Sequence, residues 1–491
     1  MHGMKKSDEA IVVEKPANKG ERFPAESVER RASPEGKPES QSTRRTQSRG
    51  SVSQAADRIR EFIEREPKSR LTALLHHITV DALRKAYGEL KRWAAPGVDG
   101  MRWKEYAVGL EDRLVDLHDR VQRGAYRATP SRRVKIPKAD GGTRPLGVAA
   151  LEDKIVQKAV ADNLLTPIYE AEFLGFSYGF RPGRGGHDAL DALAVGIGRR
   201  KIRWIIDADI RGFFDNVSRD WMLQFLRHRI GDERVIRLIA KWLNAGVMED
   251  GEWRDDLKGT PQGAVISPIL ANVYLHYSLD LWFQRQWRTR EAEGETMMVR
   301  YADDFVVGFQ YRRDAERFLN DLKERIGRFE LEMHPEKTRL IEFGRYAAEN
   351  RRRRGEGGEE TFDFLGFTHY CRKDRKGRYG LGRKPIAKRM TRTLKRVKEE
   401  LSRRMHEGIG KTGKWLGRVL NGWLNYFAVP TSLRYLRRFA SHVLRLWMRA
   451  INRRSQKGGY SWKAMNRLAA TYWPRLGIRH PWPDRRMLVN T

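Results

Sequence analysis

The stretch MMVRYADDFVVGF, from Met297 to Phe309, places two adjacent carboxylates inside an apolar run. Nine of its residues are apolar or aromatic, and they surround Asp303 and Asp304. Two neighbouring ionised aspartates repel each other, and apolar surroundings increase this repulsion by lowering the local dielectric constant. An apolar run that is interrupted and then resumes predicts a tight hairpin turn between two strands. Because aspartate is also a common turn residue, this pair alone gives weak support for a functional site.

A second acidic stretch, IIDADIRGFFDNVS, lies upstream at Ile205 to Ser218. Asp207 and Asp209 alternate with apolar residues at the end of a predicted strand, so they point to the same face. If this strand lies beside the hairpin, Asp209 meets Asp303 and Asp304 across the sheet. Converging carboxylates would bind divalent cations such as Mg²⁺, which prefers hard oxygen ligands and shares its shell with phosphate. The pattern therefore predicts a two-metal site for phosphoryl transfer.

The charge balance indicates a polyanionic partner. The chain has 97 Lys and Arg against 63 Asp and Glu, a net charge of +34. Nucleic acid is the first candidate, and an anionic membrane surface is the second, although no run approaches the ~20 apolar residues of a spanning helix. Most of the excess lies between Arg372 and Thr491, a segment with a helical pattern. A nearly one-signed surface of that length repels itself unless neutralised, so we favour nucleic-acid binding over a merely solvated surface.

Composition divides the chain into three parts. Residues 1–54 are rich in Ser, Pro, Glu, Lys and Arg, which predicts a disordered leader. The middle alternates strand and helix patterns, and the end is basic and helical. The single cysteine, Cys371, excludes an intrachain disulfide and a CxxC zinc site. The N-terminus lacks the apolar region of a secretory signal, so we expect a cytoplasmic protein.

A series of motifs follows in order from about Lys91 to the C-terminus. The blocks are APGVDG (95–100), IPKADGGTRPLG (136–147), FSYGFRPGRGGHDAL (176–190), DADIRGFFDNV (207–217), GTPQGAVISPILANVYLH (259–276), YADD (301–304), HPEKT (334–338), FDFLGF (362–367) and GWLNYFAV (422–429). This ordered set resembles the bacterial group II intron reverse transcriptases, the intron-encoded maturases. A single block could arise by chance, but the whole order could not.

The resemblance implies a right-hand polymerase fold of the α/β (α+β) class. Fingers are expected at residues 55–195, a palm with the carboxylates at 196–370, a helical thumb merged with the maturase (X) segment at 371–470, and a short basic tail at 471–491. The implied activity is RNA-directed DNA polymerisation from dNTPs onto a primer 3′-OH, with two Mg²⁺ ions, for which Mn²⁺ is a possible substitute. The implied partners are intron RNA, which the protein would help to splice, an RNA template, and a DNA primer or target for intron mobility.

The resemblance also implies roles for individual residues. Catalytic residues are Asp209, Asp303, Asp304 and Lys337, the last as proton donor to the leaving pyrophosphate, and the metal ligands are Asp209, Ile210, Asp303 and Asp304. Nucleotide-binding residues are Lys138, Arg144, Gln262, Gly263 and Phe214, the last as a steric gate against ribonucleotides. Template and primer contacts are Arg181, Arg184, Phe364, Leu365 and Gly366, and maturase RNA contacts are Trp423, Asn425 and Tyr426. Plainer alternatives are core packing for Phe214, a solvated hairpin tip for Lys138 and Arg144, and an ordinary surface lysine for Lys337.

Other functions compete with this interpretation. Within polymerases, the alternatives are an RNA-dependent RNA polymerase, a retron or defence-associated reverse transcriptase, or a domesticated relative without its intron. The sequence has YADD where RNA polymerases usually carry GDD, and FLGF where retron enzymes usually carry VTG. An RNA chaperone on a polymerase scaffold is opposed by the intact aspartates. Since no cysteine pair occurs, we expect no HNH-type endonuclease, and the DNA primer would come from another source.

Overall fold

The computed structural model describes residues 30–31, 46–67, 69–137, 142–249, 252–254, 263–373, 377, 379–454 and 459–488. The strands are β1 (Arg30–Arg31), β2 (Ser131–Pro137), β3 (Thr143–Val148), β4 (Trp204–Asp209), β5 (Val247–Glu249), β6 (Glu252–Arg254), β7 (Thr296–Tyr301), β8 (Asp304–Phe309), β9 (Arg339–Glu342), β10 (Phe362–Phe364), β11 (Phe367–Lys373), β12 (Tyr379–Pro385) and β13 (Met487–Leu488). They form four sheets, in the orders β7-β8-β4-β9, β3-β2-β5-β6, β10-β11-β12 and β1-β13. The mixed α/β class expected from the sequence is confirmed.

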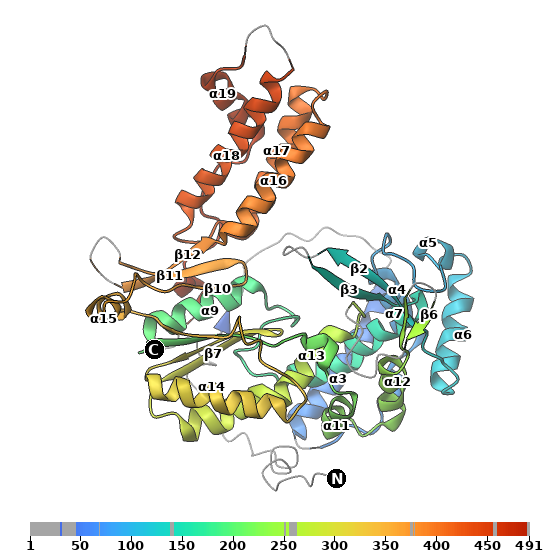
Figure 1. The fold of residues 1–491 in the computed structure, drawn as a ribbon. Coiled ribbons are helices and arrows are strands. Elements are labelled where there is room, and N and C mark those ends of the chain that lie inside the picture. The colour runs from blue at the N-terminus through green and yellow to red at the C-terminus, as the bar shows by residue number, and fades with distance from the viewer. Residues whose placement is uncertain are drawn as a thin grey trace.

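The helices cover these sheets and build the far end of the molecule (Figure 1). They are α3 (Thr46–Arg65), η1 (Leu75–His77), α4 (Val80–Glu89), α5 (Trp103–Tyr106), α6 (Leu110–Gln122), α7 (Leu151–Val160), η2 (Ala161–Leu165), α8 (Thr166–Glu170), α9 (Gly186–Arg199), α10 (Phe213–Asn216), α11 (Arg219–Arg229), α12 (Glu233–Leu243), α13 (Ser267–Leu275), η3 (His276–Asp280), η4 (Phe283–Glu291), α14 (Arg312–Gly327), α15 (Ala347–Arg353), α16 (Ala387–Arg403), α17 (Ile409–Phe427), α18 (Leu433–Asn452), α19 (Trp462–Tyr472) and α20 (Pro483–Arg486). Among the described residues, none of these helices is long and apolar enough to span a membrane.

The palm is the antiparallel sheet β7-β8-β4-β9, which is covered on both faces. On β4, Ile206 and Ala208 belong to a core shared with the fingers, whereas Ile205 belongs to a second core shared with the thumb. Helix α9 lies over one face of this sheet and α14 over the other (Figure 1). Strands buried on both faces read as nearly continuous apolar runs, which explains the sequence around Met297 to Phe309.

The fingers surround the β3-β2-β5-β6 sheet with helices α4, α6, α7 and α12 (Figure 1). On α6, Leu114, Leu117 and Val121 are buried on one face, as their helical spacing predicts. Strands β2 and β3 form a hairpin whose pairing runs from Arg132 with Val148 to Pro137 with Thr143. The basic loop singled out in the sequence joins these strands, and its residues 138–141 lie outside the described residues.

The thumb is a helical bundle joined to the palm through the β10-β11-β12 sheet. Helices α16, α17 and α18 stand away from the palm in Figure 1. Their packed faces are apolar, with Leu416 and Leu420 of α17 and Phe439 and Val443 of α18 fully buried. The basic residues are therefore left for the outer surface, as the amphipathic pattern predicts.

Both ends of the chain differ from the sequence expectation. Helix α3 begins at Thr46, inside the predicted leader, although most of that leader lies outside the described residues. The predicted basic tail at 471–491 folds back, and α20 packs against α9. Arg486 lies 3.2 Å from Asp191 of α9, and Arg199 of α9 lies 2.9 Å from Asp484. The tail is held because Asp191 and Arg199 of α9 pair with charges of opposite sign on α20, and only the folded chain brings them together.

Candidate active site

The two adjacent aspartates lie at the hairpin between β7 and β8. Tyr301 pairs with Asp304, which leaves Ala302 and Asp303 as the two turn residues. The predicted hairpin is therefore present, with Asp304 as the first residue of β8 rather than part of the turn. Ala302 has a φ of 59°, in the left-handed region that non-glycine residues avoid. A strained backbone at this position persists because the surrounding packing imposes it.

Strand β4 brings a third aspartate to the same point. Asp209 lies directly opposite Asp304 in the β4–β8 pairing. Side chains of directly opposed residues have Cβ atoms about 4.5–5.5 Å apart. Asp207, two residues earlier on β4, faces the same side as the sequence predicts, although the sequence analysis gave it no role in the site. The structure thus gathers Asp207, Asp209, Asp303 and Asp304 at one edge of the palm.

The electrostatics of this cluster reflect crowded negative charge. Burial, then the charges of Asp207, Asp303 and Asp209, raises the pKa of Asp304 to about 8. Burial and the Asp209 charge likewise raise the pKa of Asp303. Burial raises the pKa of Asp207 to about 6, although a hydrogen bond from Arg339 opposes the shift. The cluster therefore holds more negative charge than its protein surroundings neutralise.

Lys337 supplies the nearest positive charge. Its Nζ atom lies 2.7 Å from Asp209 Oδ2, and the lysine side chain is exposed. The resemblance placed this lysine in the site, and the structure brings it there. It belongs to the segment after α14, where the His334 N–H donates to the Asp209 carbonyl oxygen over 2.8 Å. This backbone bond fixes the lysine segment against the end of β4.

The donor set suits a hard divalent cation by its chemistry. Within the residues that the structure describes, no three carboxylate, imidazole or thiolate groups are placed to share one ion. Repulsion between the carboxylates explains this arrangement, since Asp209 takes the Lys337 ammonium as its counterion instead. Ile210 forms a single bridge with Met333 and its side chain is buried, so only its carbonyl oxygen could serve a metal. Aspartate and carbonyl oxygens are the ligands that Mg²⁺ prefers.

The neighbouring aromatic pair separates into one core residue and one accessible residue. Phe213 is fully buried on α10, whereas Phe214 is half-buried. Their rings meet edge to face with centroids 5.3 Å apart. Spacing from Asp209 favoured Phe214 as the steric gate, and only its ring remains available for that role.

The nucleotide-binding candidates come from the fingers hairpin and the turn before α13. Lys138 and Gln262 lie outside the described residues. Arg144 is on β3, and its charge lowers the pKa of Asp303, so it lies within electrostatic reach of the carboxylates. Gly263 has a φ of 114°, and a Cβ added there would lie 2.8 Å from the Gly147 carbonyl oxygen. Glycine is therefore required where this turn touches β3.

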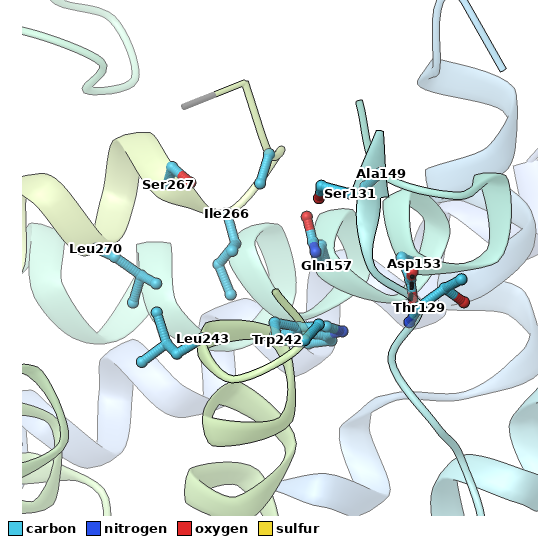
Figure 2. Close-up of a pocket in the computed structure, with 12 residues that line it drawn as sticks. Thr129, Ser131, Ala149, Asp153, Gln157, Trp242, Leu243, Ile266, Ser267 and Leu270 are labelled. Carbon is cyan, nitrogen blue, oxygen red and sulfur yellow. Dashed lines mark hydrogen bonds between the residues drawn. The ribbon is translucent and has the colours of Figure 1, made fainter. Parts of the chain in front are cut away.

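A small cavity lies beneath this turn (Figure 2). Gln157 and Asp153 of α7 line it together with Ile266 and Trp242. The Gln157 Oε1 atom accepts a hydrogen bond from the Val265 N–H over 3.1 Å. The sequence analysis missed Gln157, because nothing in its local pattern indicates a partner 108 residues away. Its amide holds the turn that carries Gly263 against the fingers.

The primer-grip candidates form a second hairpin beside the carboxylates. Leu365 and Gly366 are the turn residues between β10 and β11, with φ values of 47° and 82°. The Leu365 backbone forms a hydrogen bond with the Asp304 carboxylate. Phe364 is buried, so it stabilises the hairpin from within. The Tyr426 hydroxyl donates to the Leu365 carbonyl oxygen over 2.7 Å, so this maturase candidate is fixed to the primer grip.

The two arginines expected on the template, Arg181 and Arg184, both hold a loop together. Arg181 is buried, forms an ion pair of 3.0 Å with Glu170 and donates to the carbonyl oxygens of Leu174 and Ser177. Arg184 donates to the Gly175 carbonyl oxygen over 2.5 Å. A guanidinium has five donors in a planar fork, so it readily satisfies a loop rich in free carbonyl groups. A template contact does not fit the buried Arg181.

The GWLNYFAV block is buried in part, with Trp423 facing inward and Asn425 exposed. Trp423 is 7% exposed and stacks on Phe439 with ring centroids 4.1 Å apart. The side-chain oxygen of Asn425 accepts a hydrogen bond from Arg479, and its carbonyl oxygen lies 2.8 Å from His480 Nε2. Direct RNA binding does not fit Trp423, because its ring fills the thumb core. The block joins the base of the thumb to the C-terminal segment.

Comparison with known proteins agrees with this geometry. A family model described as reverse transcriptase (RNA-dependent DNA polymerase) matches residues 136–369, which include the three aspartates and the primer-grip hairpin. Protein YkfC of Escherichia coli strain K12 is 33% identical over 291 residues, which cover 52% of this chain and 75% of YkfC.

Two intron-associated proteins are also similar. Group II intron-encoded protein LtrA of Lactococcus lactis subsp. cremoris is 37% identical over 167 residues, which cover 34% of this chain and 27% of LtrA. Nuclear intron maturase 2, mitochondrial, of Arabidopsis thaliana is 32% identical over 108 residues, 21% of this chain and 14% of that protein. The chain spans only about a quarter or less of these two relatives. Together with the paired aspartates of the palm, these similarities show that the chain belongs to the reverse transcriptase (RNA-dependent DNA polymerase) family.

Proposed function

We propose that this protein is the reverse transcriptase of a group II intron and copies an RNA template into DNA by adding dNTPs to a primer 3′-OH. One observation carries the proposal: Asp209 and Asp304 oppose each other on adjacent palm strands, with Asp303 in the turn beside them. Carboxylates so crowded are stable in their charged form only when a cation joins them. The family uses divalent metal ions, and we propose two Mg²⁺ here.

The residues around the carboxylates support the same reaction. Bound cations would lower the pKa of the attacking hydroxyl and stabilise the leaving oxygen. Arg144 would contribute positive charge for the triphosphate, and the Lys337 ammonium, 2.7 Å from Asp209, would give a proton to the leaving pyrophosphate. Leu365 holds the primer-grip turn against Asp304, so the primer end and the carboxylates keep a fixed relation.

Primer extension on an RNA template tests the activity. Purified protein with Mg²⁺ and dNTPs should extend an annealed DNA primer, EDTA should stop extension, and Mn²⁺ should replace Mg²⁺. If RNA binds tightly yet no primer is extended at any salt concentration, the protein is an RNA chaperone on a polymerase scaffold.

The steric gate is tested separately. Phe214→Val should let ribonucleotides enter the growing strand, while Phe213→Leu, a matched change at the buried neighbour, should leave the preference for dNTPs in place. Unchanged discrimination in Phe214→Val would reject the gate.

We propose further that the thumb binds intron RNA and assists its splicing, and that the complex supports intron mobility. The support is the exposed basic face of α16, opposite its buried Val397 and Leu401. The exposed side chains on that face are Lys388, Arg389, Arg392, Lys395, Arg396 and Lys398. Phosphate contacts make such binding strongly salt-dependent.

A charge-reversal experiment tests this RNA-binding surface. Arg392→Glu with Lys395→Glu should weaken intron RNA binding and flatten its salt dependence, without changing extension on a saturating short primer–template. A self-splicing assay at low Mg²⁺ then tests the maturase role, because added protein should restore splicing. Splicing that is equally slow with and without the protein would contradict that role.

A further inference from the structure

Phe180 stands out on the palm side of the fingers. Its φ is 59°, one of five non-glycine residues with positive φ among those described. Its side chain is 53% exposed, so the ring contributes little to the core. A bulky residue pays conformational free energy in this region, and glycine or asparagine would relieve it. Backbone strain combined with an exposed ring points to a functional contact rather than to packing.

The strain is imposed by the catalytic turn itself. A Cβ added at Gly179 would lie 2.3 Å from the Ala302 nitrogen, so the chain before Phe180 presses directly on the turn. The buried Asn272 side chain donates to the Gly179 carbonyl oxygen over 2.7 Å. Arg300 Nη1 then donates both to Asn272 Oδ1 and to the Ala302 carbonyl oxygen, each over 3.0 Å. The loop and the turn are therefore tied to the same two buried side chains.

The ring lies beside the catalytic turn, on a loop that continues toward the primer grip. Its centroid is 6.3 Å from that of Tyr301, the residue that begins the YADD motif. The chain returns from Phe180 to Gly186 at the start of α9, where an added Cβ would lie 3.7 Å from Leu365 Cδ1 and 4.0 Å from Tyr301 Cε2. Phe180 and Tyr301 thus form neighbouring aromatic surface, and the loop that carries Phe180 runs on to the hairpin of Leu365.

We propose that Phe180 contacts the primer strand, its ring packing against the terminal nucleotide and holding the 3′-OH beside Asp303. This inference rests on the proposed function, because it needs a primer. Aromatic rings stack on bases of any sequence, which suits an enzyme that must grip whatever nucleotide it added last. Rigid attachment to the turn explains why the strained backbone is kept, since the ring and Asp303 then hold a fixed relation.

The test uses variants that fit the left-handed backbone. Phe180→Gly and Phe180→Asn remove the ring and relieve the strain, and Phe180→Tyr keeps the ring. The first two should weaken binding of an RNA template–DNA primer duplex by about 5- to 150-fold, with a melting temperature equal to or above that of the wild type. Phe180→Tyr should bind like the wild type. Glu330→Gly, at another left-handed position, φ 58°, controls for the backbone change and should leave duplex binding unchanged.

Crosslinking identifies the strand that Phe180 contacts. The full chain is bound to a duplex with 5-iododeoxyuridine at the primer 3′ end, or with 5-iodouridine at the template position opposite it. Light should attach the primer, and not the template, to the peptide containing Phe180. Both measurements omit dNTPs, so a failure of extension would not affect them. Unchanged duplex binding in Phe180→Gly, a lowered melting temperature with equal loss in Phe180→Tyr, or crosslinking from the template alone would overturn the inference.

Discussion

One hairpin carries a buried charge that the protein neutralises, on Arg300, and buried carboxylates that it does not neutralise, on Asp303 and Asp304. Arg300, near the end of β7, is fully buried and bonds to both oxygens of the equally buried Asp280, at 2.8 and 2.5 Å. Asp303 and Asp304, only a few residues on, face carboxylates of their own sign. The first charge is balanced inside the protein, and its loss would harm the fold. The second group is left unbalanced, and its loss would harm the reaction.

The largest effect should follow from substituting one of the carboxylates whose charge the protein does not neutralise. Asp303→Asn keeps the size of the side chain but removes the charge, so primer extension should fall on the order of 10³-fold or more. Affinity for the primer–template duplex should stay within about twofold, because the carboxylate binds metal rather than nucleic acid. Single-turnover extension and equilibrium binding measure the two quantities. An equal loss of both would place Asp303 among the structural charges instead.

Replacing the buried, paired Arg300 should act chiefly on stability, although Arg300 also holds the Ala302 carbonyl of the catalytic turn. Arg300→Met leaves the Asp280 carboxylate buried without its partner, which should lower the free energy of unfolding by about 3–5 kcal/mol. Urea denaturation measures the change. The double variant Arg300→Met with Asp280→Leu, which removes both charges, should recover most of the loss. If the single variant is as stable as the wild type, the pair does not carry the structural role assigned to it.

The pH dependence of stability should show that the charge on Asp304, unlike that on Arg300, destabilises the folded protein. In the folded protein the pKa of Asp304 is about 8, above its ordinary value of 3.8. The folded state therefore binds this proton more tightly than the unfolded state, so stability is lost as pH rises from about 4 to about 8. In metal-free buffer, Asp304→Asn should be more stable than the wild type at pH 8.5, by at least about 1 kcal/mol.

Two comparisons complete that pH experiment. The advantage of Asp304→Asn should shrink toward pH 5, and added Mg²⁺ should shrink it at high pH by neutralising the wild-type cluster. Thermal denaturation across pH, with and without Mg²⁺, measures both trends. A difference that stays constant with pH would show that charge at Asp304 does not limit stability.

The smallest effect on stability should come from Ala302, the strained turn residue between Arg300 and Asp303. Ala302→Gly removes the cost of the left-handed backbone but also loosens the unfolded chain, so we expect a net gain of roughly 0.5 kcal/mol. Extension should become slower, because Asp303 is then held less firmly. Gly308 on β8 offers a control position outside the turn, where Gly308→Ala should lower stability because its added Cβ would lie 2.8 Å from Ile202 Cγ2. A destabilised Ala302→Gly variant would mean that the turn is not strained.

Local patterns made the palm predictable. Alternation on β4 and the interrupted apolar run around Asp303 are both short-range signals, and two antiparallel strands joined by a tight turn leave few arrangements. The buried face of α6 was predictable for the same reason. The resemblance then supplied Lys337, whose contact with Asp209 spans 128 residues and has no local signature.

Contacts between residues far apart in the sequence determine which candidate residues are buried, and local sequence patterns do not predict these contacts. Arg181 and Trp423 have the residue types of nucleic-acid contacts, yet both are buried by neighbours that the fold supplies. The C-terminal segment looks like a solvated basic tail until Asp191 of α9 meets Arg486. Asp191 itself sits in an apolar helical pattern, so its two arginine partners, Arg383 and Arg486, could not be read from its surroundings.

The contact between Gly147 and Gly263 bears on the accuracy with which the enzyme would copy its template. Arg144 and Gly147 belong to the same short strand, the first within electrostatic reach of Asp303 and the second touching the turn at Gly263. If Arg144 binds the triphosphate as proposed, any movement of β3 toward the nucleotide would also move the Gly263 turn. Nucleotide binding and the position of that turn would then be mechanically coupled, and the accuracy of copying would depend on both.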